Sequence, residues 1–457
     1  MRRTLVLDVV GLTPELIGAH TPALAQLAKS GAQRPLTTIL PAVTCSVQST
    51  FTTGTPPSAH GCVGNGWYAR DLAEIGFWKQ SNHLVAGDKI WDTAKQRDPA
   101  FTCAKLFWWF NMYSTAALSV TPRPMYLADG RKLPDIYTQP PALRAHLQGR
   151  LGPFPLFDFW GPRAGITSSQ WITACAVDVW REQRPTLAMV YLPHLDYDLQ
   201  RQGPYGAGVP AALRAIDALC GDLIEIVRKD DARVIVLSEY GIVPVTGAVH
   251  INRVLREAGL VAVRTELGRE LLDPGASKAF AVADHQVAHV YVRDPDSVPW
   301  VQQLLRAVPG IERVLDRDGK RAAGLDHPRA GELVCVSTAD TWFSYYYWTD
   351  DARAPDFART VEIHRKPGYD PVELFLDPAL IAPKATVAWK LARRAMGFRT
   401  LLDVIPLDTS LVRGSHGRLT DKPEHGPVMI SSEPALVPQG AIAATAIKQL
   451  VLDHVFA

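Results

Sequence analysis

The sequence predicts an α/β protein, a three-layer sandwich of helices around a mostly parallel sheet, with lid and cap insertions. Short apolar runs alternate with amphipathic helical stretches, which is typical of βα units. Three of these runs end at an acidic residue, namely Asp8, Asp196 and Glu239. Ligands bind at the carboxyl ends of the strands in open α/β sheets. We therefore expect these carboxylates to meet in one site that suits a hard or borderline metal ion.

The composition is that of a globular protein. The 457 residues allow two or three domains, or one large domain with insertions. Hydrophobic residues make up 47% and charged residues 21%, which excludes disorder as the main state. The net charge of +2 gives no reason to expect binding to nucleic acid or to a membrane. Six scattered cysteines without a C-x-x-C motif indicate buried thiols in a reducing compartment.

The start of the chain does not resemble a secretory signal. The apolar stretch after Arg3 is broken at Asp8, and a signal peptide needs about 7–15 apolar residues. No window approaches the ~18 apolar residues of a membrane span. We therefore expect a cytoplasmic protein without a membrane partner.

The elements of the core follow in order along the chain. We expect a buried first strand at residues 4–10, and the hydroxyl-rich stretch at residues 43–50 can open a helix. The other expected core elements are helices at residues 21–29, 168–180, 211–227, 251–258 and 441–454, and strands at residues 187–192 and 233–237.

Two regions interrupt this pattern. Residues 67–165 are rich in Trp, Phe, Pro and Tyr with weak periodicity, and we interpret them as a lid insertion. Residues 271–400 alternate short strands with loops and are expected to form an α+β cap, in which residues 342–348 are a packed aromatic cluster. The predicted core is then residues 1–270 together with residues 401–457.

The first 70 residues carry motifs of a known family. Thr44 is followed by Gly54 and by the stretch at residues 56–61, PPSAHG, and Asn65 comes 21 residues after Thr44. Further along, Asp196 precedes Gly203-Pro204, Ser238-Glu239-Tyr240-Gly241 occupies the place of an S-D-H-G motif, and Gly414-Ser415-His416-Gly417 matches G-x-H-G. In this spacing the chain resembles the type I phosphodiesterase/nucleotide pyrophosphatase family of the alkaline phosphatase superfamily.

The resemblance implies a two-metal phosphoryl-transfer site. Thr44 would be the nucleophile, with Ser46 as a weaker candidate, and Asn65 would donate a hydrogen bond to a phosphate oxygen. Two ions about 4 Å apart clamp the attacking and leaving oxygens in such sites. The product of the first step would be a phospho-threonine that water then hydrolyses.

The metal ligands implied by the resemblance are altered at three positions. One ion would be held by Asp196, Gln200 and His416, where the family has Asp, His and His. The other would be held by Asp8, Thr44, Glu239 and Tyr240, where the family has Asp, Thr, Asp and His. An amide oxygen and a phenol are poor zinc ligands compared with imidazole.

Three hypotheses follow from these substitutions. The site can be tuned to Mg²⁺, Mn²⁺ or Ca²⁺ in place of Zn²⁺, since these ions prefer oxygen ligands. Alternatively, histidines from elsewhere replace the missing ones, with Asp284-His285, His194 and His250 as candidates. In the third hypothesis the two-metal chemistry is lost, and the protein binds a ligand, assists another enzyme or catalyses another reaction.

The predicted function is hydrolysis of a small phosphate ester, and the resemblance favours a diester or pyrophosphate over a monoester. Phosphonoacetate-type hydrolases share the threonine nucleophile and stay an alternative, as does a binding or accessory protein. Sulfatases are disfavoured because the residues after Cys45 do not form the C/S-x-P-x-R motif. Trp67, Tyr68, Trp108 and Trp109 are candidates for stacking on a base or aryl group, although core packing explains them equally well.

Overall fold

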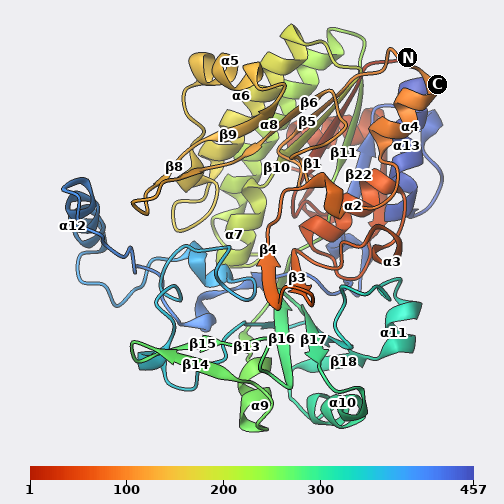
Figure 1. The fold of residues 1–457 in the computed structure, drawn as a ribbon. Helices are drawn as coiled ribbons and strands as arrows, with labels where there is room; N and C mark the ends of the chain where they lie inside the picture. Colours follow the sequence, from red (N-terminus) through yellow and green to blue (C-terminus); the bar gives the residue numbers. More distant parts are fainter.

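A computed structural model describes residues 1–457, and a nine-stranded sheet forms its centre (Figure 1). The strands in spatial order are β23 (Ile442–Ala443), β2 (Ala32–Thr37), β22 (Val428–Ser431), β11 (Arg233–Leu237), β1 (Thr4–Val9), β10 (Leu187–Leu192), β5 (Cys103–Leu106), β6 (Leu118–Pro122) and β9 (Ile136–Gln139).

The middle of this sheet is parallel. β1 pairs in parallel with β10 and with β11, and β10 pairs in parallel with β5. β22 runs antiparallel to both of its neighbours, and β9 runs antiparallel to β6. Every residue of β1 and β10 is buried, as expected for parallel strands covered on both faces. The α/β sandwich predicted from the sequence is confirmed.

Helices cover the sheet on both faces (Figure 1). One layer packs around the long amphipathic helix α8 and consists of α1 (Pro22–Ser30), α5 (Ala142–Leu151), α6 (Ile166–Glu182), α7 (His194–Gln202) and α8 (Val209–Arg228). The other layer consists of α2 (Thr44–Thr53), α3 (Pro57–His60), α4 (Ile90–Arg97) and α13 (Ile447–Phe456).

The segment predicted as a lid contributes to the core. Three strands from residues 67–165, namely β5, β6 and β9, extend the central sheet beyond β10. The lid interpretation is therefore wrong for these strands. They are only four or five residues long and carry buried polar side chains such as Lys105, Ser119 and Thr121, so the apolar pattern is weak.

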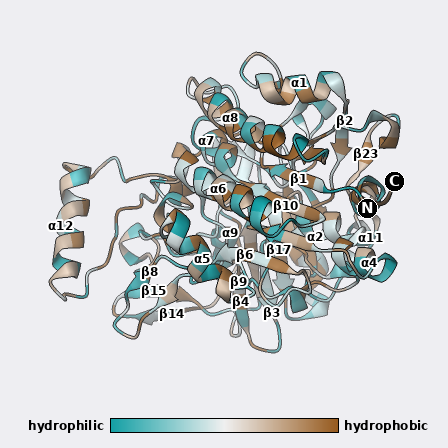
Figure 2. Ribbon diagram, turned by 90° about the horizontal axis from the view of Figure 1, so that it is seen from above, coloured by the Kyte–Doolittle hydropathy of each residue, from teal (hydrophilic) through white to brown (hydrophobic).

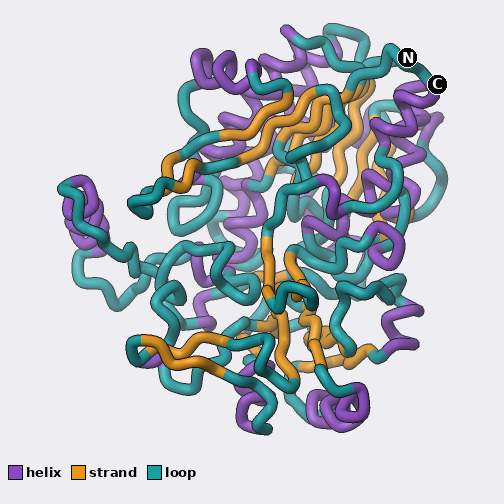
Figure 3. The backbone as a smooth tube through the Cα atoms, in the orientation of Figure 1, coloured by secondary structure: helices purple, strands orange, loops and turns teal.

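A second, antiparallel sheet forms the cap, visible as the lower group of orange strands in Figure 3. Its strands in spatial order are β16 (Ala279–Asp284), β17 (Val287–Val292), β19 (Leu333–Ser337) and β18 (Ile311–Leu315). Helices α9 (Ile251–Glu257), α10 (Val298–Arg306) and α11 (Arg317–Ala322) pack on it. Ile251 and Leu255 share the apolar cluster of this sheet, so α9 packs with the cap strands although it precedes residue 271.

Small two-stranded units complete the structure. They are β3 (Gly66–Ala69) with β4 (Glu74–Phe77), β7 (Met125–Tyr126) with β8 (Lys132–Leu133), β12 (Val243–Pro244) with β21 (Gly414–Ser415), β13 (Gly247–Val249) with β20 (Thr341–Phe343), and β14 (Val263–Glu266) with β15 (Arg269–Leu272). Residues 342–348 are all buried, which confirms the aromatic cluster as packing.

One helix stands apart. α12 (Pro383–Ala395) projects from the body of the molecule and has no buried residue (Figure 2). Apart from the helices named so far, single 3-10 turns occupy residues 14–16, 82–84, 156–158, 295–297, 351–353, 371–374, 409–411, 423–425, 434–436 and 444–446. None of the helices combines the length and the apolar character needed to cross a membrane.

Candidate functional site

The predicted site residues converge at one edge of the central sheet. Asp8 lies near the end of β1 and is in register with Leu237, the last residue of β11, so Glu239 and Tyr240 follow at the same edge. Asp196 and Gln200 lie on α7, which begins directly after β10. All five side chains are buried.

Thr44 is the first residue of α2, whose ten residues are all buried. Its hydroxyl lies 3.2 Å from the hydroxyl of Tyr240. The N-terminus of a helix carries a partial positive charge and free N–H groups. An anionic group beside Thr44 would therefore meet the favourable end of α2.

Behind Thr44, the side-chain amide of Gln48 bridges two buried carboxyl groups. Nε2 of Gln48 donates to Oδ2 of Asp8 at 3.2 Å and to Oε1 of Glu239 at 2.6 Å. Oε1 of Gln48 accepts from the backbone N–H of Trp109 at 2.8 Å, which fixes the orientation of the amide. One neutral side chain thus lies between the two carboxyl groups predicted to hold one metal ion.

The second carboxyl cluster centres on Asp196. Its Oδ1 accepts from the Tyr240 hydroxyl at 3.2 Å, and its Oδ2 accepts from Nε2 of Gln200 at 2.8 Å. The Tyr369 hydroxyl in turn donates to Oε1 of Gln200 at 3.0 Å. The two residues at altered ligand positions, Gln200 and Tyr240, therefore act as hydrogen-bond donors to Asp196.

Four rings form a continuous stack beside Asp196. The His416 ring lies 3.5 Å from that of Tyr240 and 3.8 Å from that of His285, and His285 lies 3.6 Å from Tyr369. Nδ1 of His416 bonds the carbonyl oxygen of Ala42 at 2.8 Å, so its Nε2 faces Asp196, 3.8 Å from Oδ1.

The candidate replacement pair Asp284-His285 reaches the site from the cap. Oδ1 of Asp284 bonds Nδ1 of His285 at 2.8 Å, which leaves Nε2 of the ring available. Asp284 also accepts from the backbone N–H and the side-chain amide of Asn65, at 2.7 and 3.0 Å. His285 has a left-handed backbone (φ 60°), a strained conformation of the kind that clusters at functional sites.

The other candidates fall outside this cluster. His194 is buried with no partner on either ring nitrogen, and its closest acid is Asp198 at 4.0 Å. His250 hydrogen-bonds Ser344 within the cap. Asn65 does not line the cavity, because its amide is held by Asp284 and its Oδ1 accepts from the N–H of Cys45 at 2.9 Å. These hydrogen bonds indicate that Asn65 holds the first turn of α2 in place.

Burial controls the protonation of the site. It raises the pKa of Asp196 and of Glu239 to about 7, and the pKa of Asp284 to about 6. It also raises the pKa of Asp8 well above the usual range, and neighbouring Glu239 adds to that shift. Burial lowers the pKa of His285 and of His416 far below the usual value, so both rings are neutral.

These residues differ from the two-ion centre that the resemblance implies, although Oδ1 of Asp8, Oε2 of Glu239 and Nε2 of His416 are buried without a hydrogen-bond partner. The Gln48 amide donates to both acids of one expected ion site, and donors from Gln200 and Tyr240 occupy the oxygens of Asp196. Amide N–H and phenol O–H groups are hydrogen-bond donors, not ligands. No group of three or more His, Cys, Asp or Glu side chains is arranged to hold a metal ion.

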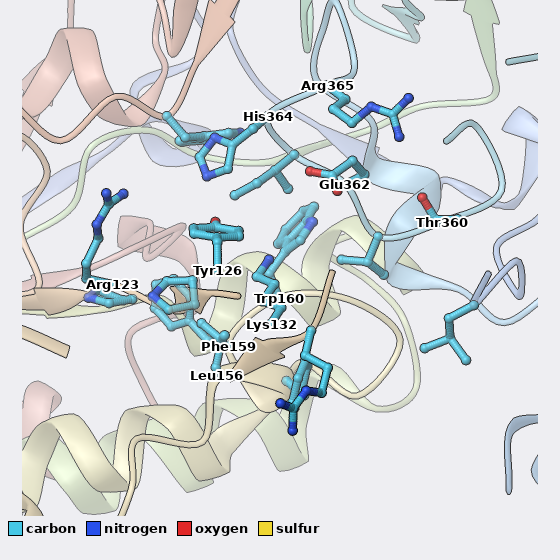
Figure 4. Close-up of a pocket in the computed structure, with 18 of the residues that line it drawn as sticks. Arg123, Tyr126, Lys132, Leu156, Phe159, Trp160, Thr360, Glu362, His364 and Arg365 are labelled. Carbon is cyan, nitrogen blue, oxygen red and sulfur yellow. The ribbon is translucent and has the colours of Figure 1, made fainter. Parts of the chain in front are cut away.

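A large cavity opens from the site toward α12. Its volume is about 2030 Å³, compared with roughly 300–1,000 Å³ for ordinary ligand pockets. Thr44, Asp196, Tyr240 and His285 line its inner end, whereas Asp8, Gln48 and Glu239 lie behind the wall. Figure 4 shows its outer part, where Tyr126, Phe159 and Trp160 lie among charged side chains that include Arg123, Lys132, Glu362 and Arg365.

The predicted aromatic candidates divide between the cavity and the core. Trp67 and Trp109 line the cavity, and the ring of Trp109 lies 4.8 Å from that of Trp78. Trp108 is fully buried, and Tyr68 packs edge-on against Phe280 in the cap.

Comparison with known proteins identifies the family. The family model described as type I phosphodiesterase / nucleotide pyrophosphatase matches residues 4–370. The chain belongs to this family. It is a family of hydrolytic enzymes that act on phosphate esters, so the chain is a phosphoester hydrolase by class. Among curated proteins, no sequence matches this one.

Solved structures support the fold. Phosphonoacetate hydrolase from Sinorhizobium meliloti 1021, in complex with phosphonoformate, aligns with a TM-score of 0.63 at 16% identity, covering 99% of this chain and 96% of the other. Murine ectonucleotide pyrophosphatase / phosphodiesterase 5, in complex with AMP, aligns with a TM-score of 0.60 at 13% identity, covering 100% and 95%. The human counterpart gives a TM-score of 0.60 at 13% identity, covering 99% and 95%. At these identities the likeness concerns the fold.

Two participants were missed from the sequence. Gln48 stood in a hydroxyl-rich stretch without a motif of its own. Its spacing of four residues from Thr44 was the available signal, since residues four apart share one face of a helix. Tyr369 lies far along the chain in the cap region and has no sequence signal that links it to Gln200.

Proposed function

We propose that the protein hydrolyses a phosphate ester, a diester or pyrophosphate rather than a monoester, with Thr44 as the nucleophile. The observation that carries this proposal is the position of Thr44. Its hydroxyl lies at the N-terminus of a buried helix, at the inner end of a large cavity, among side chains whose pKa lies near neutrality.

Thr44 would attack phosphorus while its proton passes to Glu239. A general base works best when its pKa lies near the working pH. Burial raises the pKa of Glu239 to about 7, and the neighbouring side chains of Asp8, Gln48 and Thr44 lower it in part. The new Oγ–P bond forms as the P–O bond to the leaving alcohol breaks, and the alcoholate takes a proton from solvent.

Hydrolysis of the phospho-threonine would then restore the enzyme. A water molecule attacks phosphorus and releases one proton to solvent, the P–Oγ bond breaks, and Thr44 recovers the proton held by Glu239. The end of α2 stabilises the charge on the phosphoryl oxygens in both steps. Tyr240 holds the Thr44 hydroxyl in place, since the pKa of this phenol lies well above its usual value through burial.

The test compares Thr44→Ala with Thr44→Ser on bis(para-nitrophenyl) phosphate, para-nitrophenyl phosphate and phosphonoacetate. We expect Thr44→Ala to lose at least about a hundredfold in turnover, and Thr44→Ser to keep part of it. Mass spectrometry of the acid-quenched wild type should find phosphate on Thr44. Full activity of Thr44→Ala with an unchanged melting temperature would exclude this nucleophile.

The same experiment separates the alternatives. Release of phosphate from phosphonoacetate, with no turnover of the esters, would favour a phosphonate hydrolase. A protein that turns over none of the three, yet binds a phosphate analogue equally well as wild type and as Thr44→Ala, would be a binding protein.

A further inference from the structure

Helix α12 is the one α-helix of the molecule without a buried residue. None of its 13 residues is buried, and Figures 1 and 2 show it projecting from the body. Arg394 ties it to the β7–β8 turn through one hydrogen bond of 3.0 Å to the carbonyl oxygen of Gly130. A helix of this length is only marginally stable without packing, so its exposed position calls for an explanation.

Large apolar side chains are concentrated around this helix. Seven of the 18 exposed large hydrophobic residues of the chain fall between residues 376 and 401. They are Leu376, Ile381, Trp389, Leu391, Met396, Phe398 and Leu401. Trp389 is 62% exposed and Ile381 is 91% exposed. Exposed apolar patches of this kind mark interaction sites.

The same stretch is strongly basic. Residues 381–402 contain Lys384, Lys390, Arg393, Arg394 and Arg399 and no acidic residue. Only Lys390 forms an ion pair, with Asp403. The net charge of +2 for the whole chain conceals this concentration.

The helix presents two faces with different surroundings. Lys384, Val387, Ala388, Leu391, Arg394 and Ala395 follow a helical repeat and line the cavity. Trp389, Lys390, Arg393 and Met396 lie between these positions and do not line it. We call these four residues the outer face of α12.

We propose that the outer face of α12 docks on an anionic lipid bilayer, and that the substrate is an amphiphilic phosphate ester that passes from the bilayer into the cavity. The substrate part of this proposal rests on the proposed hydrolase function, whereas the docking part stands on α12 alone.

The side chains of α12 favour an anionic lipid bilayer over a second copy of the chain. Helices with Lys or Arg beside Trp, Phe and Leu lie in the interface of a bilayer, with their apolar side chains at the acyl boundary. Each basic residue near an anionic surface adds about 1 kcal/mol of attraction. A second copy of the chain would place this basic segment against an identical one, and like charges oppose that contact.

The lining of the cavity indicates the class of substrate. The cavity runs from the cavity-lining face of α12 past Phe159, Trp160 and Trp78 to Thr44. Of its 56 lining residues, 29 are hydrophobic. Such a lining suits an apolar chain, with the phosphate placed at the buried end. A nucleotide would fill a small part of this volume.

The docking test uses sedimentation of the full-length protein with vesicles. We expect binding to vesicles of equal parts phosphatidylcholine and phosphatidylglycerol, weaker binding in high salt, and little binding to phosphatidylcholine alone. Trp389→Ala/Met396→Ala and, separately, Arg393→Glu should each weaken binding about tenfold or more. The matched control is Trp300→Ala, which removes an exposed tryptophan from α10 in the cap and should bind as wild type.

Two outcomes would overturn docking. One is the absence of binding to anionic vesicles. The other is equal binding by wild type and Trp389→Ala/Met396→Ala. A dimer in sedimentation velocity that dissociates in the same variant, without vesicle binding, would assign the face to a second copy and likewise overturn the proposal.

A second measurement tests the substrate class separately. Turnover of a phosphodiester that carries a long alkyl chain, presented in anionic vesicles, should fall about tenfold in Trp389→Ala/Met396→Ala. Turnover of soluble bis(para-nitrophenyl) phosphate should not change, because these residues do not line the cavity. Vesicle binding without turnover of any ester would contradict the hydrolase function and leave docking intact. Equal turnover of the alkyl ester by both proteins would contradict delivery from the bilayer.

Discussion

Helices α2 and α12 reverse the usual relation between polarity and burial. α2 is rich in Ser and Thr, yet all its residues are buried, whereas α12 carries Val, Leu and Trp and none of its residues is buried. The hydroxyls of Ser49, Thr50 and Thr53 bond carbonyl oxygens one turn earlier, which satisfies them inside the protein. The buried polar side chains of α2 and the exposed apolar side chains of α12 both lie in regions to which we assign a function.

Among the site residues, the largest effect is expected from the amide at the centre of α2. Gln48→Leu removes the donor shared by Asp8 and Glu239 and leaves two buried carboxyl groups without it. We expect a loss of about 3 kcal/mol or more in the free energy of unfolding, measured by urea titration. Ser46→Ala is the control in the same helix. The Ser46 hydroxyl is buried without a partner, so its removal should be neutral or stabilising. Equal losses in both variants would contradict the role of Gln48.

A second effect concerns metal ions, because the side-chain amide of Gln48 lies between the two carboxyl groups where the resemblance implies an ion. Zinc or manganese should not raise the melting temperature of the wild type. The triple variant Gln200→His/Glu239→Asp/Tyr240→His restores the ligand types of the family and should bind zinc. An ion at a hundred times its dissociation constant would stabilise the variant by about 2.7 kcal/mol. Elemental analysis that finds two ions per wild-type chain would show that our view of the site is incorrect.

The acidity of the site should make stability depend on pH. Burial raises the folded-state pKa of Asp196 and Glu239 to about 7, from their ordinary values of 3.8 and 4.5. The folded protein therefore holds more protons than the unfolded chain between about pH 4 and 7, so stability falls as pH rises through this window. Each of the two groups changes the free energy of unfolding by at most about 1.4 kcal/mol per pH unit. Urea titrations at several pH values should show this slope, and Asp196→Asn should reduce it. A flat profile would contradict the shifts.

The smallest effect is expected on α12. Trp389→Ala should change the free energy of unfolding by less than about 0.5 kcal/mol, because the side chain is 62% exposed. Phe51→Ala in α2 removes a fully buried ring and should cost about 3–5 kcal/mol. Similar losses in the two variants, by thermal and urea denaturation, would mean that α12 is packed in solution.

Much of the core could be predicted because its strands are buried on both faces. The predicted strands at residues 187–192 and 233–237 agree with β10 and β11 residue for residue. The C-terminal helix was predicted from residue 441, but the chain first forms β23 and a 3-10 turn, and α13 begins at Ile447. Apolar residues in a short edge strand and in a helix look alike without a longer period.

The site could be predicted in part. The resemblance pointed to Asp8, Thr44, Asp196, Glu239 and His416, and the structure places all five at one edge of the sheet. Their roles, the domain division and the cytoplasmic location stay predictions. The contacts of Gln200 and Tyr240 could not be predicted, since the choice between ligand and donor depends on where each side chain points. The role of α12 was hidden because composition averages charge over the whole chain.

The contact between Asp284 and Asn65 has a consequence for folding. Asp284 ends a strand of the cap sheet, and it holds both the backbone and the side chain of a core residue. His285 adds a ring stacked on His416 at the core edge. The two sheets therefore share one cooperative unit, and calorimetry should record a single melting transition. A cap excised from this protein would leave the start of α2 unsupported.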